Sequence, residues 1–186
     1  MTTLAGIDAP APATVYPDDQ GLRQQVLRPY RPNCRYLVSA EVHAAADQVT
    51  VRGKFRISES CYIDDTGHFN AVEFNICFNQ AAYYLFASCV REKPFDAFAN
   101  WTMADYCEHQ LADMLIYRYR CQFRRPINSR SFEGEITFSE PVVRAREGKS
   151  PMMLISSPCR FWDASGGRAD GEVTLAVINL PAGSGP

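Results

Sequence analysis

The alternation of apolar and polar residues divides the chain into a strand-rich start, a helical centre and a strand-rich end. Residues 49–57 (VTVRGKFRI) place Val49, Val51, Phe55 and Ile57 on one face and charged or hydroxyl side chains on the other. This period of two is typical of an antiparallel strand with one face in water. Residues 35–42 alternate in a similar way, and residues 45–48 (AADQ) predict the hairpin turn between the two strands.

The centre of the chain predicts one long buried helix. Residues 69–91 contain neither Pro nor Gly and are mostly apolar, and Pro94 follows them. Shorter helices are expected over residues 18–30 and 102–110, the second with Thr102 as N-cap and Asp105 completing a variant of the capping box. Later apolar runs between turn signals predict strands over 114–123, 132–138, 142–146, 152–162 and 172–180.

This order of elements predicts an α+β fold. A helix that is apolar over most of its surface needs a layer wrapped around it, and a curved antiparallel sheet supplies one, as in the hot-dog fold. Residues 1–17 are rich in Ala, Pro and Thr and predict a disordered N-terminal arm. We therefore expect a single hot-dog domain over residues 18–181 and a flexible tail over 182–186.

Composition excludes several classes of function. Of the 186 residues, 46% are hydrophobic and 22% charged, and the net charge of −2 gives no reason to expect nucleic acid or an anionic membrane as a partner. No apolar run reaches the roughly 18 residues that span a bilayer, and no secretory signal is visible. The seven cysteines form no CxxC pair and the three histidines are far apart. We expect a cytoplasmic protein without disulfides, metal or other cofactor.

The predicted central helix carries polar residues on two stripes. At 100° per residue, Asn75, Asn79 and Tyr83 share one face, whereas Glu73 and Gln80 share another. These side chains either bond to backbone inside the core or line a ligand cavity, and the sequence leaves both interpretations open.

A histidine stands at the start of the same helix. The free N–H groups of Phe69 and Asn70 would form an anion site there, and His68 is placed for proton transfer near pH 7. The chain contains no Gly-x-Ser-x-Gly motif, phosphate loop or dinucleotide fingerprint that would indicate other chemistry.

Long segments of the chain resemble the FcoT-type thioesterases, a hot-dog family of actinobacteria. The segments are LRPYRPNCRYL, SESCYIDDTGHFNAVEFNICFNQAAY, WTMADYCEHQLADMLI and FWDASGGRADGEVTLAVINLP, and the resemblance covers about residues 20–181. Members in isonitrile lipopeptide gene clusters add glycine to C3 of an α,β-unsaturated acyl thioester on an acyl carrier protein. They then release a (3R)-3-(carboxymethylamino) fatty acid by hydrolysis. The resemblance therefore implies a (2E)-enoyl-acyl-carrier-protein glycyltransferase, a lyase with thioesterase activity.

The resemblance also implies site residues. The family's two tyrosines and two asparagines along the acyl cleft correspond to Tyr30, Tyr62, Asn70 and Asn79. We expect His68, Asn70, Tyr62 and Asn79 to be catalytic. Substrate-binding residues are expected to be Tyr30, Asn75, Tyr83 and Phe78, with the acyl tail along Phe74, Phe78, Leu85 and Phe86.

Other questions stay open at this level. The cation for the glycine carboxylate could be Lys54, Arg56, Arg118, Arg120 or Arg124. The donor could be a carrier protein or coenzyme A, and we expect a homo-oligomer built on a hot-dog dimer. Two alternatives to glycine addition remain: a plain acyl-CoA or acyl-carrier-protein thioesterase, and a non-catalytic acyl-binding module.

Overall fold

The computed structural model describes residues 13–64, 66–146 and 148–182, and its main feature is one antiparallel sheet. The strands run in the order β1-β2-β3-β5-β7-β8-β4, and β6 pairs with β7 beside this path. Their bounds are β1 Thr14–Tyr16, β2 Leu37–Ala44, β3 Gln48–Phe55, β4 Met114–Arg125, β5 Phe132–Ser139, β6 Val142–Arg146, β7 Lys149–Trp162 and β8 Arg168–Val177.

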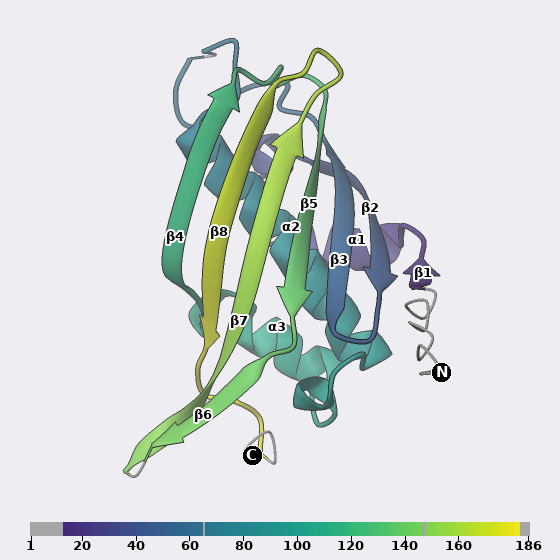
Figure 1. Cartoon of the computed structure of the whole chain (residues 1–186), viewed down its shortest axis with the longest axis vertical. Coiled ribbons are helices and arrows are strands. Elements are labelled where there is room, and N and C mark those ends of the chain that lie inside the picture. Colours follow the sequence, from purple (N-terminus) through teal and green to yellow (C-terminus); the bar gives the residue numbers. More distant parts are fainter. Residues whose placement is uncertain (1–12, 65, 147, 183–186) are drawn as a thin grey trace, which may run out of the picture.

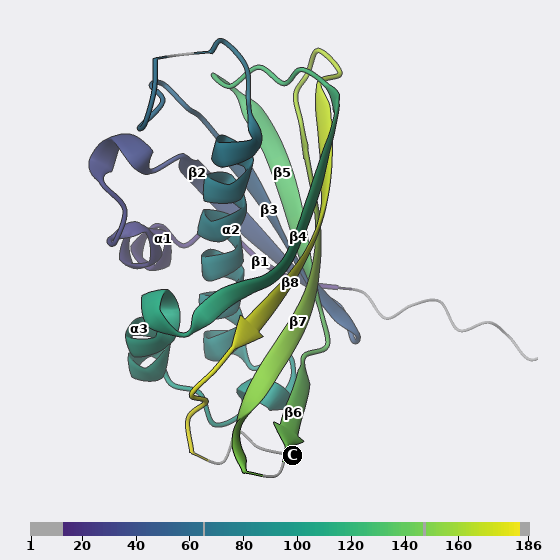
Figure 2. The same ribbon diagram turned by 90° about the vertical axis from the view of Figure 1, so that its left-hand side faces the viewer.

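A long helix crosses the concave face of this sheet. The helices are α1 (Gln20–Leu27), α2 (Ala71–Glu92) and α3 (Met103–Ala112), with short 3₁₀ turns η1 at Pro32–Cys34 and η2 at Asp96–Phe98. The sheet lies in front of α2 in Figure 1, and Figure 2 shows α2 between the sheet and the two shorter helices α1 and α3. This is the hot-dog arrangement that the sequence predicts, with β2 and β3 before the helix and β4 to β8 after it.

Most predicted elements are present, with shifted ends. The capping box of α3 is confirmed, since Thr102 accepts from the Asp105 N–H and Asp105 accepts from the Thr102 N–H. The prediction of a disordered arm over residues 1–17 is wrong for Thr14–Tyr16, which form β1 and pair with Ala44, His43 and Val42. Three residues are too few to show periodicity. The rest of that prediction, and most of the tail, lie outside the described residues.

The core fills the space between α2 and the sheet with aromatic side chains. The ring of Phe74 packs against those of Phe161 in β7 and Phe123 in β4, with centroid distances of 4.8 and 5.9 Å. Gly171 of β8 permits this approach, because a Cβ there would lie 2.7 Å from Phe74 Cζ and 2.6 Å from Cys159 Sγ. The sheet-facing side of α2 is therefore close-packed.

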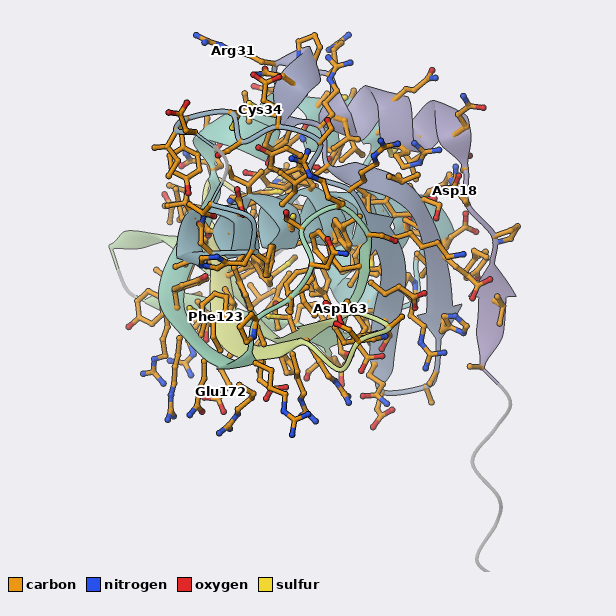
Figure 3. The ribbon with its side chains drawn as sticks, turned by 90° about the horizontal axis from the view of Figure 1, so that it is seen from above. Asp18, Arg31, Cys34, Phe123, Asp163 and Glu172 are labelled. Atoms are coloured by element: carbon orange, nitrogen blue, oxygen red, sulfur yellow. The ribbon has the colours of Figure 1, made fainter. Side chains whose placement is uncertain are left out.

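The opposite face of the sheet is charged. Cross-strand ion pairs join Arg120 to Glu172 and Arg124 to Asp170, between β4 and β8. Seen from above in Figure 3, Glu172 lies on the side of the sheet away from the helices, whereas Arg31 and Cys34 lie on the helical side. Among the described residues, no helix is long and apolar enough to cross a membrane.

Candidate active site

The N-terminus of α2 is organised by Asn70. Its Oδ1 accepts hydrogen bonds from the Val72 and Glu73 N–H groups at 2.9 and 3.2 Å, and Glu73 Oε2 accepts from the Asn70 N–H at 3.3 Å. These bonds form a reciprocal capping box that satisfies helix donors otherwise left open. Asn70 is therefore first of all the residue that starts the helix.

Tyr62 joins this cap from the preceding loop. Its hydroxyl donates to Asn70 Oδ1 at 2.8 Å, so this oxygen accepts from three donors. The Asn70 Nδ2 group makes no hydrogen bond within the described part of the chain, and the Tyr62 ring is 42% exposed. The structure thus brings two predicted catalytic residues into contact and leaves an amide donor available beside them.

His68 lies next to this pair with a defined tautomer. Its Nδ1 lies 3.0 Å from the carbonyl oxygen of Thr66. A carbonyl oxygen only accepts, so in the neutral imidazole Nδ1 carries the proton and the lone pair is on Nε2. The side chain is exposed, and Nε2 is free to act as a base.

The prediction that the Phe69 and Asn70 N–H groups form an anion site is wrong. The Phe69 N–H donates to the Ile127 carbonyl at 3.1 Å, and the Asn70 N–H donates to Glu73. The N–H of Ala71 is the first-turn donor that stays without a partner in the described chain. Sequence spacing locates the helix start, but the bond to Ile127 forms only when the β4–β5 loop packs there.

A cavity of about 430 Å³ opens at this helix end. It lies between the start of α2 and the end of β4, and its lining contains two arginines, one histidine and no acidic residue. The lining residues are His68, Phe69, Asn70, Ala71, Phe123, Arg124, Arg125 and Pro126.

A second polar group lies further along α2. Asn75, Asn79 and Tyr83 are half-buried on the face that α2 turns away from the core, and neither asparagine makes a hydrogen bond among the described residues. Tyr30, which follows α1, packs beside them. Its pKa is raised by burial and, to a smaller extent, by the neighbouring Tyr83 and Cys77.

Tyr106 of α3 joins this second group and was missed by the sequence prediction. Its hydroxyl is buried and has no hydrogen-bond partner in the part of the chain that the structure describes. Burial raises its pKa, with Tyr83 the next largest cause and Tyr30 a smaller one. The position follows from the packing of α3 on α1, where Gln110 Nε2 donates to the Val26 carbonyl. A tyrosine in a short helix carries no signal of this in the sequence.

The two groups are separate within one protomer. Asn79 is nine positions after Asn70, and a rise of about 1.5 Å per residue places them about 13.5 Å apart along the axis. One protomer therefore assembles His68, Tyr62 and Asn70 at the helix start, and it assembles Tyr30, Asn79 and Tyr83 elsewhere.

Glu73 and Gln80 serve the fold. Gln80 is fully buried, its Oε1 accepts from the Tyr36 and Leu37 N–H groups at 2.9 and 3.0 Å, and its Nε2 donates to the Cys34 carbonyl. These bonds fix the start of β2 against α2. Of the two interpretations that the sequence left open, bonding to groups inside the core therefore explains the polar residues Glu73 and Gln80.

The structure also revises the expected acyl path. Phe78 is 0% exposed and lies on the sheet-facing side with Phe74 and Leu85, and it lines none of the described cavities. The ring of Phe86 packs against the rings of Phe98 and Trp101, with centroid distances of 4.9 and 5.1 Å. The predicted tail-binding face is therefore closed core, whereas Ile76 and Tyr83, on the same face of α2 as Asn79, are only half-buried and leave apolar surface accessible.

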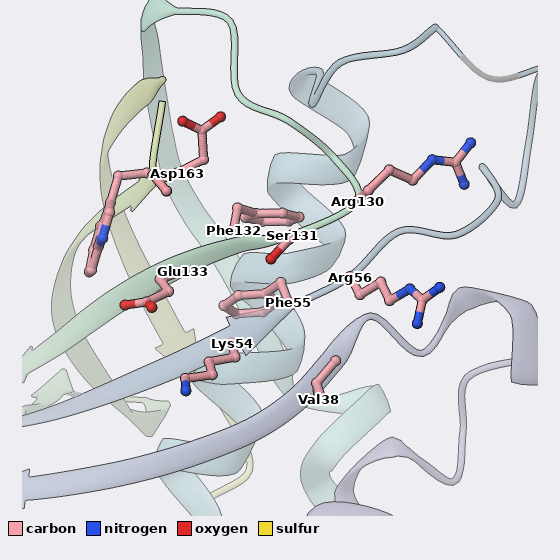
Figure 4. Close-up of a pocket in the computed structure, with 11 residues that line it drawn as sticks. Val38, Lys54, Phe55, Arg56, Arg130, Ser131, Phe132, Glu133 and Asp163 are labelled. Atoms are coloured by element: carbon pink, nitrogen blue, oxygen red, sulfur yellow. The ribbon is translucent and has the colours of Figure 1, made fainter. Parts of the chain in front are cut away.

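Most of the predicted cations lie elsewhere. Lys54 and Arg56 line a separate cavity of about 420 Å³ together with Arg130. In Figure 4, Arg56 and Arg130 extend their guanidinium groups in the same direction. Arg118 and Arg120 do not line the cavity at His68, whereas Arg124 does but is paired with Asp170 at 3.3 Å. Arg125, which the prediction did not consider for this role, also lines it.

Strand β4 leaves an edge of the sheet open. Within the described chain its ladder partner is β8 alone, and its apolar side chains Leu115, Ile116, Tyr117 and Phe123 are exposed, Tyr117 by 67%. Such an edge is a template for pairing with another strand.

The fold and the site identify the class of protein. Residues 25–177 match the model of the FcoT-like thioesterase domain, so the chain belongs to the FcoT-like thioesterase family.

Curated relatives make the assignment more particular. A Streptomyces coeruleorubidus protein named "(2E)-enoyl-[ACP] glycyltransferase" is 49% identical over 163 residues, which cover 88% of this chain and 99% of that protein. A Mycobacterium tuberculosis protein of the same name is 41% identical over 168 residues, covering 89% of this chain and 90% of that one. Among solved structures, a thioesterase family protein from Silicibacter pomeroyi is similar at 16% identity and a TM-score of 0.41, over 86% of this chain and all of that one.

Proposed function

We propose that this protein is a (2E)-enoyl-acyl-carrier-protein glycyltransferase that also hydrolyses the thioester. The observation that carries the proposal is His68, which lines a cavity with two arginines and no acidic residue and whose Nδ1 is engaged by the Thr66 carbonyl. A base next to a cation-lined cavity suits an amino acid whose amine must lose a proton and whose carboxylate needs a positive partner. The names of the relatives at 41–49% identity agree with it.

The addition step needs one base and one set of oxygen donors. His68 Nε2 takes a proton from the glycine ammonium, and the amine then forms the N–C3 bond with the enoyl thioester. The C2–C3 π electrons move to C2 and the thioester oxygen, giving an enolate. The proton held on His68 returns at C2, which completes a 3-(carboxymethylamino) acyl thioester with no change in redox state.

The enolate oxygen requires neutral hydrogen-bond donors. The unbonded Asn79 amide is suited to this role, as are the tyrosines beside it, because burial raises the pKa of Tyr30 and Tyr83 and keeps both hydroxyls protonated. Such donors gain strength as charge develops on the oxygen. In the hydrolysis step water attacks the thioester carbon C1, and the same donors stabilise the tetrahedral oxyanion. Its collapse breaks the C–S bond, so the carrier's thiol leaves and the (3R)-3-(carboxymethylamino) fatty acid is released.

The distance between the two polar groups favours a shared site in a homodimer. His68 and Asn79 of one protomer are too far apart to act on one thioester. Pairing of two β4 edges about a twofold axis runs the two α2 helices in opposite directions. We infer that this arrangement brings the helix start of one protomer to the Asn79 stripe of its partner. The exposed apolar residues of β4 become buried in that arrangement.

The second cavity is suited to the carrier protein. Three cations, Lys54, Arg56 and Arg130, line it against two carboxylates, Glu133 and Asp163. The phosphopantetheine arm joins its carrier through a phosphodiester that arginines bind well. Arg130 is five residues from Arg125 of the first cavity, so a span of at most about 18 Å separates their backbones. We place the reaction in the cytoplasm, where carrier proteins are loaded and the seven free cysteines stay reduced.

The direct test is incubation with a 2-enoyl carrier-protein thioester, with and without glycine, followed by mass spectrometry. We expect a glycine adduct and its free acid only when glycine is present. Release of free enoic acid without any adduct would instead identify a plain thioesterase. His68→Ala should remove adduct formation while circular dichroism stays unchanged, and unaltered turnover would exclude His68 as the base.

The shared site has its own test in subunit mixing. His68→Ala and Asn79→Ala homodimers should each be inactive. Random exchange gives heterodimers with one intact site, so the mixture should recover about a quarter of the wild-type activity. If both residues of a site came from one protomer, mixing would restore nothing.

A further inference from the structure

Among the described residues, Arg125 is the cation of the His68 cavity that has no ion-pair partner. Arg124 is paired with Asp170, which also pairs with Arg168 at 2.9 Å. Arg125 forms no ion pair or side-chain hydrogen bond within the described part of the chain. The lining supplies no carboxylate that could neutralise it. A guanidinium in this position has its full bonding capacity available for a ligand.

The backbone fixes this arginine beside the histidine. The carbonyl of Ile127, two residues after Arg125, accepts the N–H of Phe69, the residue after His68, at 3.1 Å. This bond joins the end of β4 to the start of α2 and holds both residues on one cavity wall. Arg125 Nη1 lies 3.8 Å from where a Cβ on Gly166 would stand, so the guanidinium lies beside the β7–β8 turn.

The reaction brings one small carboxylate to this cavity. Glycine must present its amine to His68 Nε2 and place its carboxylate elsewhere, only two bonds from the nitrogen. A guanidinium binds a carboxylate through two parallel hydrogen bonds and fixes its orientation. An anion among neutral groups alone would pay a large desolvation penalty.

We propose that Arg125 binds the carboxylate of the amine substrate and makes the enzyme selective for an α-amino acid over neutral amines. This inference rests on the proposed function. Arg125 thereby sets which amine reaches His68, while the steps at the thioester do not depend on it.

The test compares glycine with glycinamide, which keeps the amine and lacks the negative charge. Arg125→Met retains most of the side-chain volume and removes the charge. Loss of a charge-assisted contact should raise the KM for glycine about 10- to 100-fold. The kinetics with glycinamide should change little, so the preference for glycine collapses. Arg125→Lys keeps the charge without the planar fork and should lie between the two.

Arg144→Met provides the matched control. Arg144 is exposed on β6, away from both cavities and without an ion pair among the described residues. It should leave the preference for glycine unchanged. Hydrolysis of a saturated acyl thioester, which needs no amine, reports whether the Arg125 variants are folded and active.

The outcomes separate this inference from the proposed function. If the wild-type protein forms no glycine adduct, the proposed function fails. If the wild type forms the adduct and Arg125→Met keeps the wild-type ratio of glycine to glycinamide turnover, Arg125 is not the carboxylate partner and the inference fails alone.

Discussion

Asn79 and Gln80 are neighbours in the sequence, carry the same amide group and lie on the same helix, yet they differ in their bonding. Gln80 is fully buried and its oxygen and nitrogen bond to backbone groups of Cys34, Tyr36 and Leu37. Asn79 is half-buried and makes no hydrogen bond within the described chain.

The difference separates two uses of a polar group on a buried helix. An amide that its own chain satisfies holds elements together, and its loss leaves several buried partners unpaired. An amide without a partner in the free protein adds little to stability but is available to a substrate. Changes on the Gln80 stripe should therefore alter the free energy of unfolding, and changes on the Asn79 stripe should alter turnover.

Gln80→Leu should have the largest effect on stability. It leaves the buried N–H groups of Tyr36 and Leu37 without an acceptor, at about 1–3 kcal/mol each, or about 4 kcal/mol together. Chemical denaturation should show this loss with an unchanged slope. A loss below about 1 kcal/mol would mean that β2 is not anchored through this amide.

Asn79→Ala should lower turnover and leave the free energy of unfolding unchanged. Removal of an oxyanion donor typically costs about 3 kcal/mol of transition-state stabilisation, or a fall of 10² to 10³ in kcat. The unfolding midpoint should stay within error of the wild type, since no internal bond is lost. A stability loss as large as that of Gln80→Leu would remove the contrast between the two stripes.

Asp163, a carboxylate in the β7–β8 turn, is another polar group whose hydrogen bonds are made within its own chain. Burial raises its pKa, but hydrogen bonds from Asn128, Ser165 and Gly167 outweigh this and lower the pKa from 3.8 to about 2. Because the folded pKa is depressed, the stabilisation is full above the unfolded value and is lost as the pH falls toward 2. It amounts to about 2 kcal/mol. Asp163→Asn should abolish this part of the acid dependence in denaturation curves measured from pH 5 to pH 2.

Asn70 should contribute both to stability and to turnover. Asn70→Ala removes the N-cap of α2 and should cost about 1 kcal/mol of stability. Asn70→Asp keeps a capping oxygen and replaces the Nδ2 donor by a charged oxygen, which a helix N-terminus favours, so its stability should be no lower than that of the wild type. If the free amide contacts substrate, both variants lose adduct formation; full activity in Asn70→Asp would restrict Asn70 to capping.

The smallest effects are expected from two buried tyrosine hydroxyls without partners, those of Tyr106 and Tyr119. Removing such a hydroxyl relieves a desolvation penalty, so Tyr106→Phe and Tyr119→Phe should each be as stable as the wild type or more stable by about 1 kcal/mol. Tyr106 adjoins Tyr30 and Tyr83, whereas Tyr119 adjoins Cys121 and Cys159. Only Tyr106→Phe should lower turnover. Equal kinetics in both variants would show that the Tyr106 hydroxyl has no role at the site.

The elements were predictable because their signals are local. The alternation over residues 49–57 and the Thr102 cap specify structure within a few residues of themselves, and both are present in the fold. The partner of an individual atom is not specified locally. The Phe69 N–H looked free from its position at a helix start, but it bonds to Ile127, which is 58 positions away by residue number (127 − 69).

The predicted cations failed for a related reason. Lys54 alternates as expected on β3 and Arg56 directly follows that strand, yet both line the other cavity and not the one at His68. Arg125 has the same charge and no distinctive pattern, and it reaches the cavity because its strand ends beside α2. Periodicity determines a face of the sheet, while the site also depends on which strand ends meet.

The sequence alone determined the long central helix, the strands around it, the family and the position of His68 at the helix start. Hydrophobic periodicity, caps and long matching segments encode these features directly. The tertiary structure decided which amides were already bonded, which arginine stood beside the histidine, and that the two polar groups of α2 were too far apart to form one site in a single protomer. These outcomes depend on contacts between segments distant in the chain, and such contacts form only when the sheet packs around the helix.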